Sequence, residues 1–310
     1  MTLPFGITWY GAAVALSVPC SLWLLCALRE REAREIGGPG TRWIIGRVDP
    51  VKLAVWVVAA ALVCARLSYC LVRFSFFVFE MGPLSILNLR MGGYLLYGAV
   101  LGGLAAAVHA ARSEQADVIA TLDELAAPGM LAVLISRLAE STTTEGVGAW
   151  IENPALQRFP IAVQNEYGEW QLAIFLLEAL IAAAILIALI ARRYARGERI
   201  MTALLLYAGT QIVCESLRMD SCLRVGFVRV SQVISAVVIL AVTVVRARCY
   251  GDKKTLLLRI AAVLLGAAAV GGLEWALDKT EVDNRILYLV MTAVCVWLMA
   301  AGSRFKKKTA

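Results

Sequence analysis

Long apolar runs follow one another along almost the whole chain, with short polar segments between them. A helix needs about 20 mainly apolar residues to cross the hydrocarbon core of a bilayer. Nine runs approach this length, at residues 9–28, 53–72, 92–111, 116–138, 172–191, 200–217, 230–245, 256–276 and 286–301. Asp117, Asp123 and Glu124 interrupt the start of the fourth run, which favours a shorter or oblique helix there. The pattern predicts an all-α, polytopic transmembrane helix bundle of about nine spans.

The composition narrows the class further. The chain has 310 residues, of which 60% are hydrophobic and only 17% are charged, so there is no room for a separate soluble domain. The net charge is +7, but the basic residues sit in short clusters between apolar runs. Since no basic stripe with interleaved aromatic residues occurs, we exclude nucleic acid as a partner and expect the lipid bilayer instead.

The eight cysteines contain no CxxC pair, and most lie within apolar runs. Cysteines in such positions usually behave as small hydrophobic residues. We therefore expect neither a metal site nor a cofactor.

Basic clusters mark every second connection and predict the orientation. They lie at residues 29–47, 192–199, 246–254 and 304–308. Because positively charged loops stay in the cytoplasm, the N-terminus is expected outside and the C-terminus inside. The long connection at 139–169 then falls outside, and its Thr, Gly and Pro residues predict a surface cap.

Polar residues inside the runs gather toward their outer ends. Arg66, Tyr69 and Arg73 share one helical face. Another stripe and several single residues complete the set: Tyr207, Gln211, Glu215, Arg218, Tyr10, Arg137, Glu140, Gln171, Glu178 and Gln232. A charged residue in a span costs about 2.5–3.5 kcal/mol on insertion scales, and such residues usually face the bundle interior and mark function. Snorkelling toward the interface and a structural ion pair, such as Arg66 with Glu215, are the alternatives to a functional cavity.

Two features point to the kind of ligand. Arg66 and Arg137 favour a phosphate, because guanidinium groups bind phosphate oxygens bidentately. Gly98 and Gly102 form a GxxxG pattern, which permits either close helix packing or a ligand against the backbone. A phosphate within an apolar bundle indicates a phospholipid head group. The residues alone do not separate an enzyme from a transporter or a lipid-binding scaffold.

Several ordered pieces between residues 9 and 235 resemble the prolipoprotein diacylglyceryl transferase family. They are Trp9-Tyr10-Gly11, Arg66-Leu67-Ser68-Tyr69, Gly92-Gly93 with Gly98 and Gly102-Gly103, Arg137 with Glu145 and Gly148, Gln171-Leu172 with Glu178, Tyr207 with Glu215 and Arg218, and Ser231-Gln232 with Ser235. The resemblance implies transfer of a diacylglyceryl group from phosphatidylglycerol to the lipobox cysteine in preprolipoprotein signal peptides, at the bacterial cytoplasmic membrane. It also implies a seven-helix domain at 1–247, followed at 248–310 by two additional helices and a basic cytoplasmic tail.

The resemblance also assigns roles to residues. The implied catalytic residues are Arg137, Tyr97, Glu145 and Glu215. The implied substrate-binding residues are Tyr10, Arg66, Tyr69, Glu140, Gly148, Tyr207, Gln211 and Arg218. Three of these depart from the family pattern, because Tyr97 replaces a histidine, Gln211 an arginine and Glu140 an asparagine. The alternatives are therefore a member that binds phospholipid or lipoprotein without this chemistry, or with altered specificity, and a lipid transporter.

Overall fold

The structure is a computed structural model that describes residues 8–35, 47–88, 92–219, 223–225, 228–250 and 253–303. The basic tail expected after Ser303 and part of the first basic loop lie outside these residues. The described part contains the helices α1 (Trp9–Glu35), α2 (Pro50–Val72), α3 (Leu96–Ser113), α4 (Val118–Ala139), α5 (Ile174–Ala191), α6 (Glu198–Leu217), α7 (Val230–Tyr250), α8 (Lys253–Lys279) and α9 (Asn284–Ser303). Each expected apolar run coincides with one of them.

Eight of these helices are long and apolar enough to cross a membrane: α1, α2 and α4 to α9. The all-α polytopic bundle is therefore confirmed, and the chain is a multi-pass membrane protein. The third expected span differs. Gly92 and Gly93 have positive φ angles of 68° and 77°, so they form a turn, and α3 begins only at Leu96. Because α3 also contains glycines and ends in polar residues, it does not meet the same criterion.

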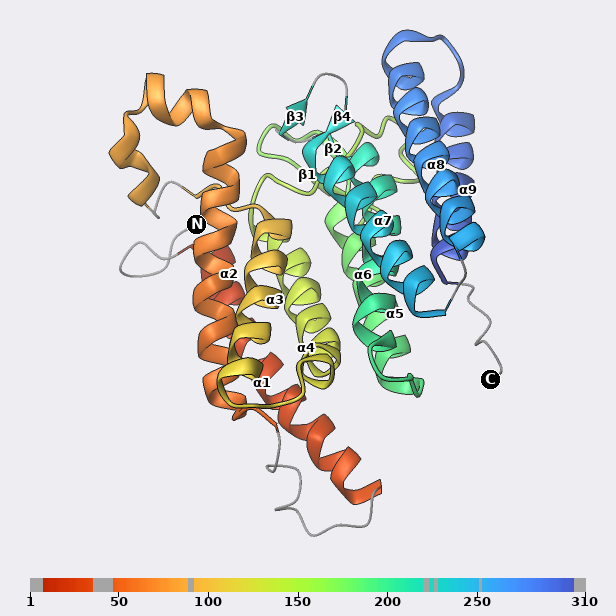
Figure 1. Ribbon diagram of the computed structural model, residues 1–310. Coiled ribbons are helices and arrows are strands. Elements are labelled where there is room, and N and C mark those ends of the chain that lie inside the picture. The colour runs from red at the N-terminus through yellow and green to blue at the C-terminus, as the bar shows by residue number, and fades with distance from the viewer. Residues whose placement is uncertain are drawn as a thin grey trace. The chain divides into compact units, whose positions relative to one another are not determined.

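The chain divides into two compact units, and each is described by itself. The first comprises residues 1–14, 133–193 and 201–310. A buried core lies among α6, α7, α8 and α9 and includes Leu205, Ile212, Ile239, Met291 and Leu298. α8 and α9 form a hairpin beside α7 (Figure 1).

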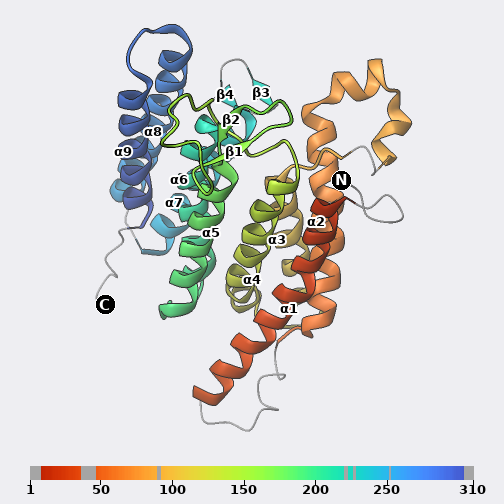
Figure 2. The same ribbon diagram turned by 180° about the vertical axis from the view of Figure 1, so that it is seen from behind.

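The second unit comprises residues 15–132 and 194–200. Its helices α2 and α3 lie side by side in both views (Figures 1 and 2). A Cβ atom at Gly102 would lie 2.5 Å from the carbonyl oxygen of Ala60, and one at Gly98 would lie 2.7 Å from that of Cys64. The GxxxG pattern therefore serves close helix packing, one of the two alternatives that the sequence leaves open.

Polar side chains fix the starts of three helices. Asp49 accepts hydrogen bonds from the backbone N–H groups of Val51 and Lys52 at the start of α2. Asp117 caps α4 in the same way. Asp123 accepts from the N–H groups of Gly197 and Ile200 and so holds the start of α6. Two of the three acidic residues that interrupt the fourth apolar run, Asp117 and Asp123, thus satisfy N–H groups that have no partner within a helix, whereas Glu124 pairs with Arg29.

The connection between α4 and α5 carries a small sheet that the apolar pattern does not predict. Strands β1 (Ala162–Gln164) and β2 (Trp170–Leu172) pair antiparallel. A second pair, β3 (Arg224–Val225) and β4 (Val228–Arg229), precedes α7. Gly148 and Trp150 form single bridges to Arg218 and Gln171. These pairings hold the connection against the helix ends of the first unit.

Candidate functional site

A cluster of buried charged residues lies where α4 ends, α5 begins and α6 ends. Glu178 stands at its centre, and its Oε2 lies 3.3 Å from Nη1 of Arg137 and 3.1 Å from Nη1 of Arg218. Nη1 of Arg137 also lies 2.5 Å from Glu140. The side chain of Glu178 is only 1% exposed, so its charge depends on these guanidinium groups rather than on water.

Gln211 of α6 and Arg229 of β4 extend the cluster. The amide of Gln211 donates to Glu178 over 2.8 Å and to Glu215 over 3.1 Å. Arg229 pairs with Glu215 at 3.8 Å. We call these residues the arginine–glutamate cluster: Arg137, Glu140, Glu178, Gln211, Glu215, Arg218 and Arg229. Its three arginines face three glutamates, so its formal charge is zero.

Two tyrosines border Arg137. The hydroxyl of Tyr207 accepts a hydrogen bond from Nη2 of Arg137 over 3.1 Å. The hydroxyl of Tyr10 lies 3.2 Å from Oγ of Ser136, the residue before Arg137. Nε of Arg137 is buried and has no hydrogen-bond partner among the described residues. A buried N–H without a partner costs about 1–3 kcal/mol, so this donor is suited to a ligand.

Glycines in the following segment make room for the cluster. Gly146 has a φ of 75°, and a Cβ atom there would lie 2.5 Å from Oε2 of Glu140. A Cβ atom at Gly148 would lie 2.8 Å from the carbonyl oxygen of Leu217. Close packing against the end of α6 therefore explains why residue 148 is a glycine. Glu145, between them, is exposed.

Arg66 belongs to the second unit and holds a folded segment there. Its Nε donates to Ile86, its Nη2 to Ser85 and Asn88, and its Nη1 to Gly92 and Gly93, in each case to the carbonyl oxygen. All five N–H groups of the guanidinium are thus used. Arg66 bonds to backbone oxygens in this structure, and a phosphate contact would require one of these bonds to open.

Tyr69 and Tyr97 also lie in the second unit. The ring of Tyr69 packs against Gly93, where a Cβ atom would overlap it. Tyr97 is buried in the first turn of α3. The expected site residues therefore fall into two groups. The first unit brings together Tyr10, Arg137, Glu140, Glu145, Gly148, Tyr207, Gln211, Glu215 and Arg218, and the second holds Arg66, Tyr69 and Tyr97.

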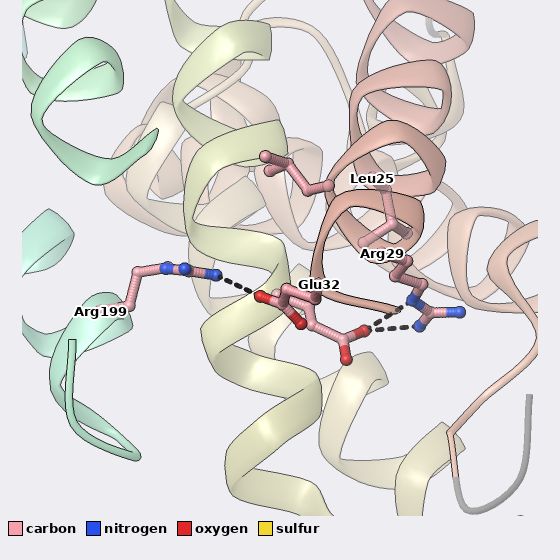
Figure 3. A pocket seen from close by; sticks show the side chains of 6 residues that line it. Leu25, Arg29, Glu32 and Arg199 are labelled. Carbon is pink, nitrogen blue, oxygen red and sulfur yellow. Dashed lines mark hydrogen bonds and ion pairs between the residues drawn. The ribbon is translucent and has the colours of Figure 1, made fainter. Parts of the chain in front are cut away.

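A separate ion-pair network lies in the second unit (Figure 3). Arg29 donates to Glu124 from Nε and Nη2, at 2.9 and 2.6 Å, and Arg199 pairs with Glu32 at 3.4 Å. The small pocket beside these residues is lined by Leu25, Leu28, Arg29, Glu32, Glu124 and Arg199. Outside the helices, the hydrogen bond from Arg196 holds the pKa of Asp117 below its usual range. Because the charged groups beside this pocket are already paired with one another, we interpret this network as structural.

The cluster contains residues that the sequence did not single out as site residues. Glu178 is the only charged residue in α5, and this isolation is the signal that could have placed it at the centre. Arg229 precedes the Ser231-Gln232 motif, but nothing in the sequence indicates its pairing with Glu215. Gly146 was also missed, since its positive φ is visible only in the structure.

The fold and the cluster define a multi-pass helical membrane protein with a buried arginine–carboxylate site. The chain belongs to the prolipoprotein diacylglyceryl transferase family, whose sequence model matches residues 1–248. Three relatives are each named phosphatidylglycerol–prolipoprotein diacylglyceryl transferase. The protein from Bacillus cytotoxicus is 30% identical over 241 residues, covering 75% of this chain and 84% of the relative. Those from Limosilactobacillus reuteri and Synechococcus elongatus are 29% and 30% identical, covering 76% and 82% of this chain and 84% and 87% of the relatives.

Proposed function

We propose that this protein transfers a diacylglyceryl group from phosphatidylglycerol to the lipobox cysteine of a preprolipoprotein, at the bacterial cell membrane. Membership of the family and the names of the relatives support the reaction. One observation carries the proposal for this chain. Arg137 comes from one motif and Tyr207, Glu215 and Arg218 from another, yet the structure groups all four around Glu178.

The reaction explains why such a cluster is needed. The cysteine sulfur, as a thiolate, attacks the terminal glyceryl carbon of the diacylglyceryl group and forms a thioether bond. The bond from this carbon to the phosphate oxygen breaks, and its electron pair leaves with glycerol phosphate. The thiol proton passes to a base. Negative charge therefore grows on the departing phosphate, where a fixed guanidinium group stabilises it best.

We assign the phosphate contact to Arg137, because its buried Nε is a donor without a hydrogen-bond partner among the described residues and its guanidinium lies between Tyr207 and the central carboxylates. Tyr10 and Tyr207 lie beside it and suit contacts to the head group. Glu145 is an exposed carboxylate in the same unit and suits acceptance of the thiol proton. Glu215, Gln211 and Arg218 shape the cluster. The roles of Arg66, Tyr69 and Tyr97 rest on the sequence motifs alone.

The orientation proposed from the basic loops fits this site. With the N-terminus outside, α4 and α6 run outward, and Arg137 and Arg218 lie at their outer ends. The cluster then faces the outer leaflet, where a lipid head group and an exported signal peptide meet. The basic segments near Arg193 and Arg248 lie at the opposite helix ends.

The proposal is tested with purified protein in vesicles that contain phosphatidylglycerol and a lipobox peptide. We expect the unmodified protein to lipidate the peptide and Arg137→Ala to reduce the rate by at least about 100-fold, the typical cost of a lost transition-state donor. The control is Arg158→Ala, since Arg158 is an exposed arginine of the same unit. Full activity of Arg137→Ala would overturn its role. Absence of transfer by folded, unmodified protein would overturn the function.

The charge balance of the cluster favours a second candidate. Arg137 already faces Glu140 and Glu178, so a phosphate must compete with two carboxylates. This arrangement supports a protein that binds phospholipid or lipoprotein without transfer, or one that uses a different phospholipid. Rescue of a bacterial strain that lacks its own transferase, with Arg137→Ala as control, separates these candidates. Rescue supports transfer, and binding without rescue supports the second candidate.

A further inference from the structure

The helices α8 and α9 follow the segment that the family model matches, yet they pack closely against it. A Cβ atom at Gly209 of α6 would lie 2.6 Å from Sδ of Met299 in α9. Gly209 stands between Tyr207 and Gln211, so Met299 seats against the helix that carries the cluster. The hydroxyl of Tyr288 donates to the carbonyl oxygen of Ser216 over 3.3 Å, next to Glu215.

Glu274 is the buried carboxylate of this hairpin. It is 8% exposed and accepts a hydrogen bond of 2.5 Å from Nε2 of Gln232 in α7. A carboxylate inside a membrane helix is costly and usually has a functional reason. Leu273 and Leu277, near it on α8, pack into the apolar core instead. Glu274 is thus directed toward Gln232 rather than into that core.

Gln232 also contacts Arg229. Its Oε1 accepts from the backbone N–H of Arg229 over 3.1 Å, and its Nε2 also donates to the carbonyl oxygen of Ile212. An amide can rotate by half a turn and exchange its oxygen and nitrogen. The carboxylate of Glu274 holds the nitrogen on the α8 side, so the oxygen stays on Arg229. Loss of the carboxylate would remove one of the three hydrogen bonds that fix this amide, and would loosen its hold on Arg229.

Arg229 in turn contacts two other residues of the arginine–glutamate cluster. Its Nη2 donates to the carbonyl oxygen of Arg218, and its Nη1 lies 3.8 Å from Oε2 of Glu215. A continuous set of contacts therefore leads from Glu274 through Gln232 and Arg229 to the cluster.

We propose that Glu274 is a positioning residue for the arginine–glutamate cluster and acts through Gln232 on Arg229. The α8–α9 hairpin then helps to position the residues of the site and is more than an added membrane anchor. This inference rests on the proposed function, because its main readout is the transfer rate.

The test compares Glu274→Leu, Glu274→Gln and the control Glu281→Gln in the vesicle assay. Glu281 is an exposed carboxylate between α8 and α9. We expect Glu274→Leu to lower kcat about tenfold with KM for phosphatidylglycerol nearly unchanged, the effect of one lost buried hydrogen bond. Glu274→Gln keeps an acceptor oxygen and should recover most of kcat. Unchanged kcat in Glu274→Leu overturns the inference, whereas an inactive unmodified protein overturns the proposed function instead.

A second set of variants tests the path through Gln232. Gln232→Leu should lower kcat as Glu274→Leu does, and the double variant should lose little more, because both remove the same contact. If Glu274→Leu fails to fold, variants that exchange the side chains at positions 232 and 274 test the path instead. Gln232→Glu puts two carboxylates against each other and should lose activity, and Glu274→Gln in the same chain should restore it. The path would be contradicted if the two Leu variants lowered kcat multiplicatively in the double variant. It would also be contradicted if Glu274→Gln failed to restore the activity of Gln232→Glu.

Discussion

Gln211 donates its side-chain amide to Glu178 over 2.8 Å and so lies directly against the central carboxylate of the site. The same NH₂ group reaches Glu215 at 3.1 Å. Both N–H groups of this amide therefore donate to buried carboxylates. Without the amide, the two carboxylates would face each other with no donor between them.

This contact predicts the results of two substitutions at Gln211, one for stability and one for binding of phosphatidylglycerol. Gln211→Leu removes both donors and should lower the free energy of unfolding by about 1–3 kcal/mol. Gln211→Arg keeps donors and adds one positive charge, so binding of phosphatidylglycerol should strengthen. Detergent-solubilised protein gives the first result by thermal unfolding, and vesicle binding gives the second. Weaker phosphatidylglycerol binding by folded Gln211→Arg would contradict the role of charge balance.

Glu178 should be the least replaceable carboxylate of the cluster. Arg137 and Arg218 share two carboxylates, Glu140 and Glu178, and Glu178→Ala removes the more buried one. Loss of one side of a buried ion pair costs about 3–5 kcal/mol. We expect a large fall in thermal stability and loss of transfer. The matched control is Glu152→Ala, an exposed glutamate of the same unit. Equal melting temperatures for the two variants would argue against the central position of Glu178.

The close approach of α2 and α3 predicts that Gly102 tolerates no side chain. In Gly102→Ala, the new methyl group would meet Ala60 O at 2.5 Å and Cys64 Cβ at 2.6 Å. Because backbone must shift to make room, we expect a loss of about 1–3 kcal/mol. A Cβ atom at Gly129 of α4 meets nothing within 4 Å in the described structure, so Gly129→Ala is the control. Thermal unfolding of both variants measures the difference.

Arg66 should control the order of the segment that it binds. Arg66→Lys retains the charge but offers three donors instead of five, so carbonyl oxygens between Ser85 and Gly93 lose partners. Hydrogen exchange and proteolysis within residues 82–95 should rise, while α5 to α7 exchange as before. Unchanged protection of this segment would mean that Arg66 is dispensable there and available for a ligand.

The proposed orientation predicts which cysteine a membrane-impermeant maleimide reaches. Cys249 is a free, exposed cysteine at the end of α7, next to basic residues. With the other cysteines replaced by serine, we expect no labelling in intact spheroplasts and full labelling in inside-out vesicles. Glu281→Cys, at the opposite end of α8, should give the reverse result. Labelling of Cys249 from outside would overturn the orientation.

The sequence by itself determined the helices, the membrane class and the family. Each run of apolar residues became a helix within a few positions, as for residues 230–245 and α7, because hydrophobic length is a local property. It also determined that Tyr207, Gln211 and Glu215 share one side of α6, with Arg218 directly after its end, since helical spacing fixes a face. The local rule failed at Gly92 and Gly93, where positive φ angles delay α3.

Only the tertiary structure decided which charges meet. Glu178 lies 41 positions after Arg137 and 40 before Arg218, and no spacing rule relates them. The bonds of Arg66 to backbone oxygens, the cradle that Gly146 gives Glu140 and the contact of Glu274 with Gln232 are of the same kind. A buried charge must be neutralised by whatever the packing brings near it, and that partner is chosen by distances between helices rather than by the order of residues. The buried polar residues could therefore be recognised along the chain, but the partners that other helices supply could not.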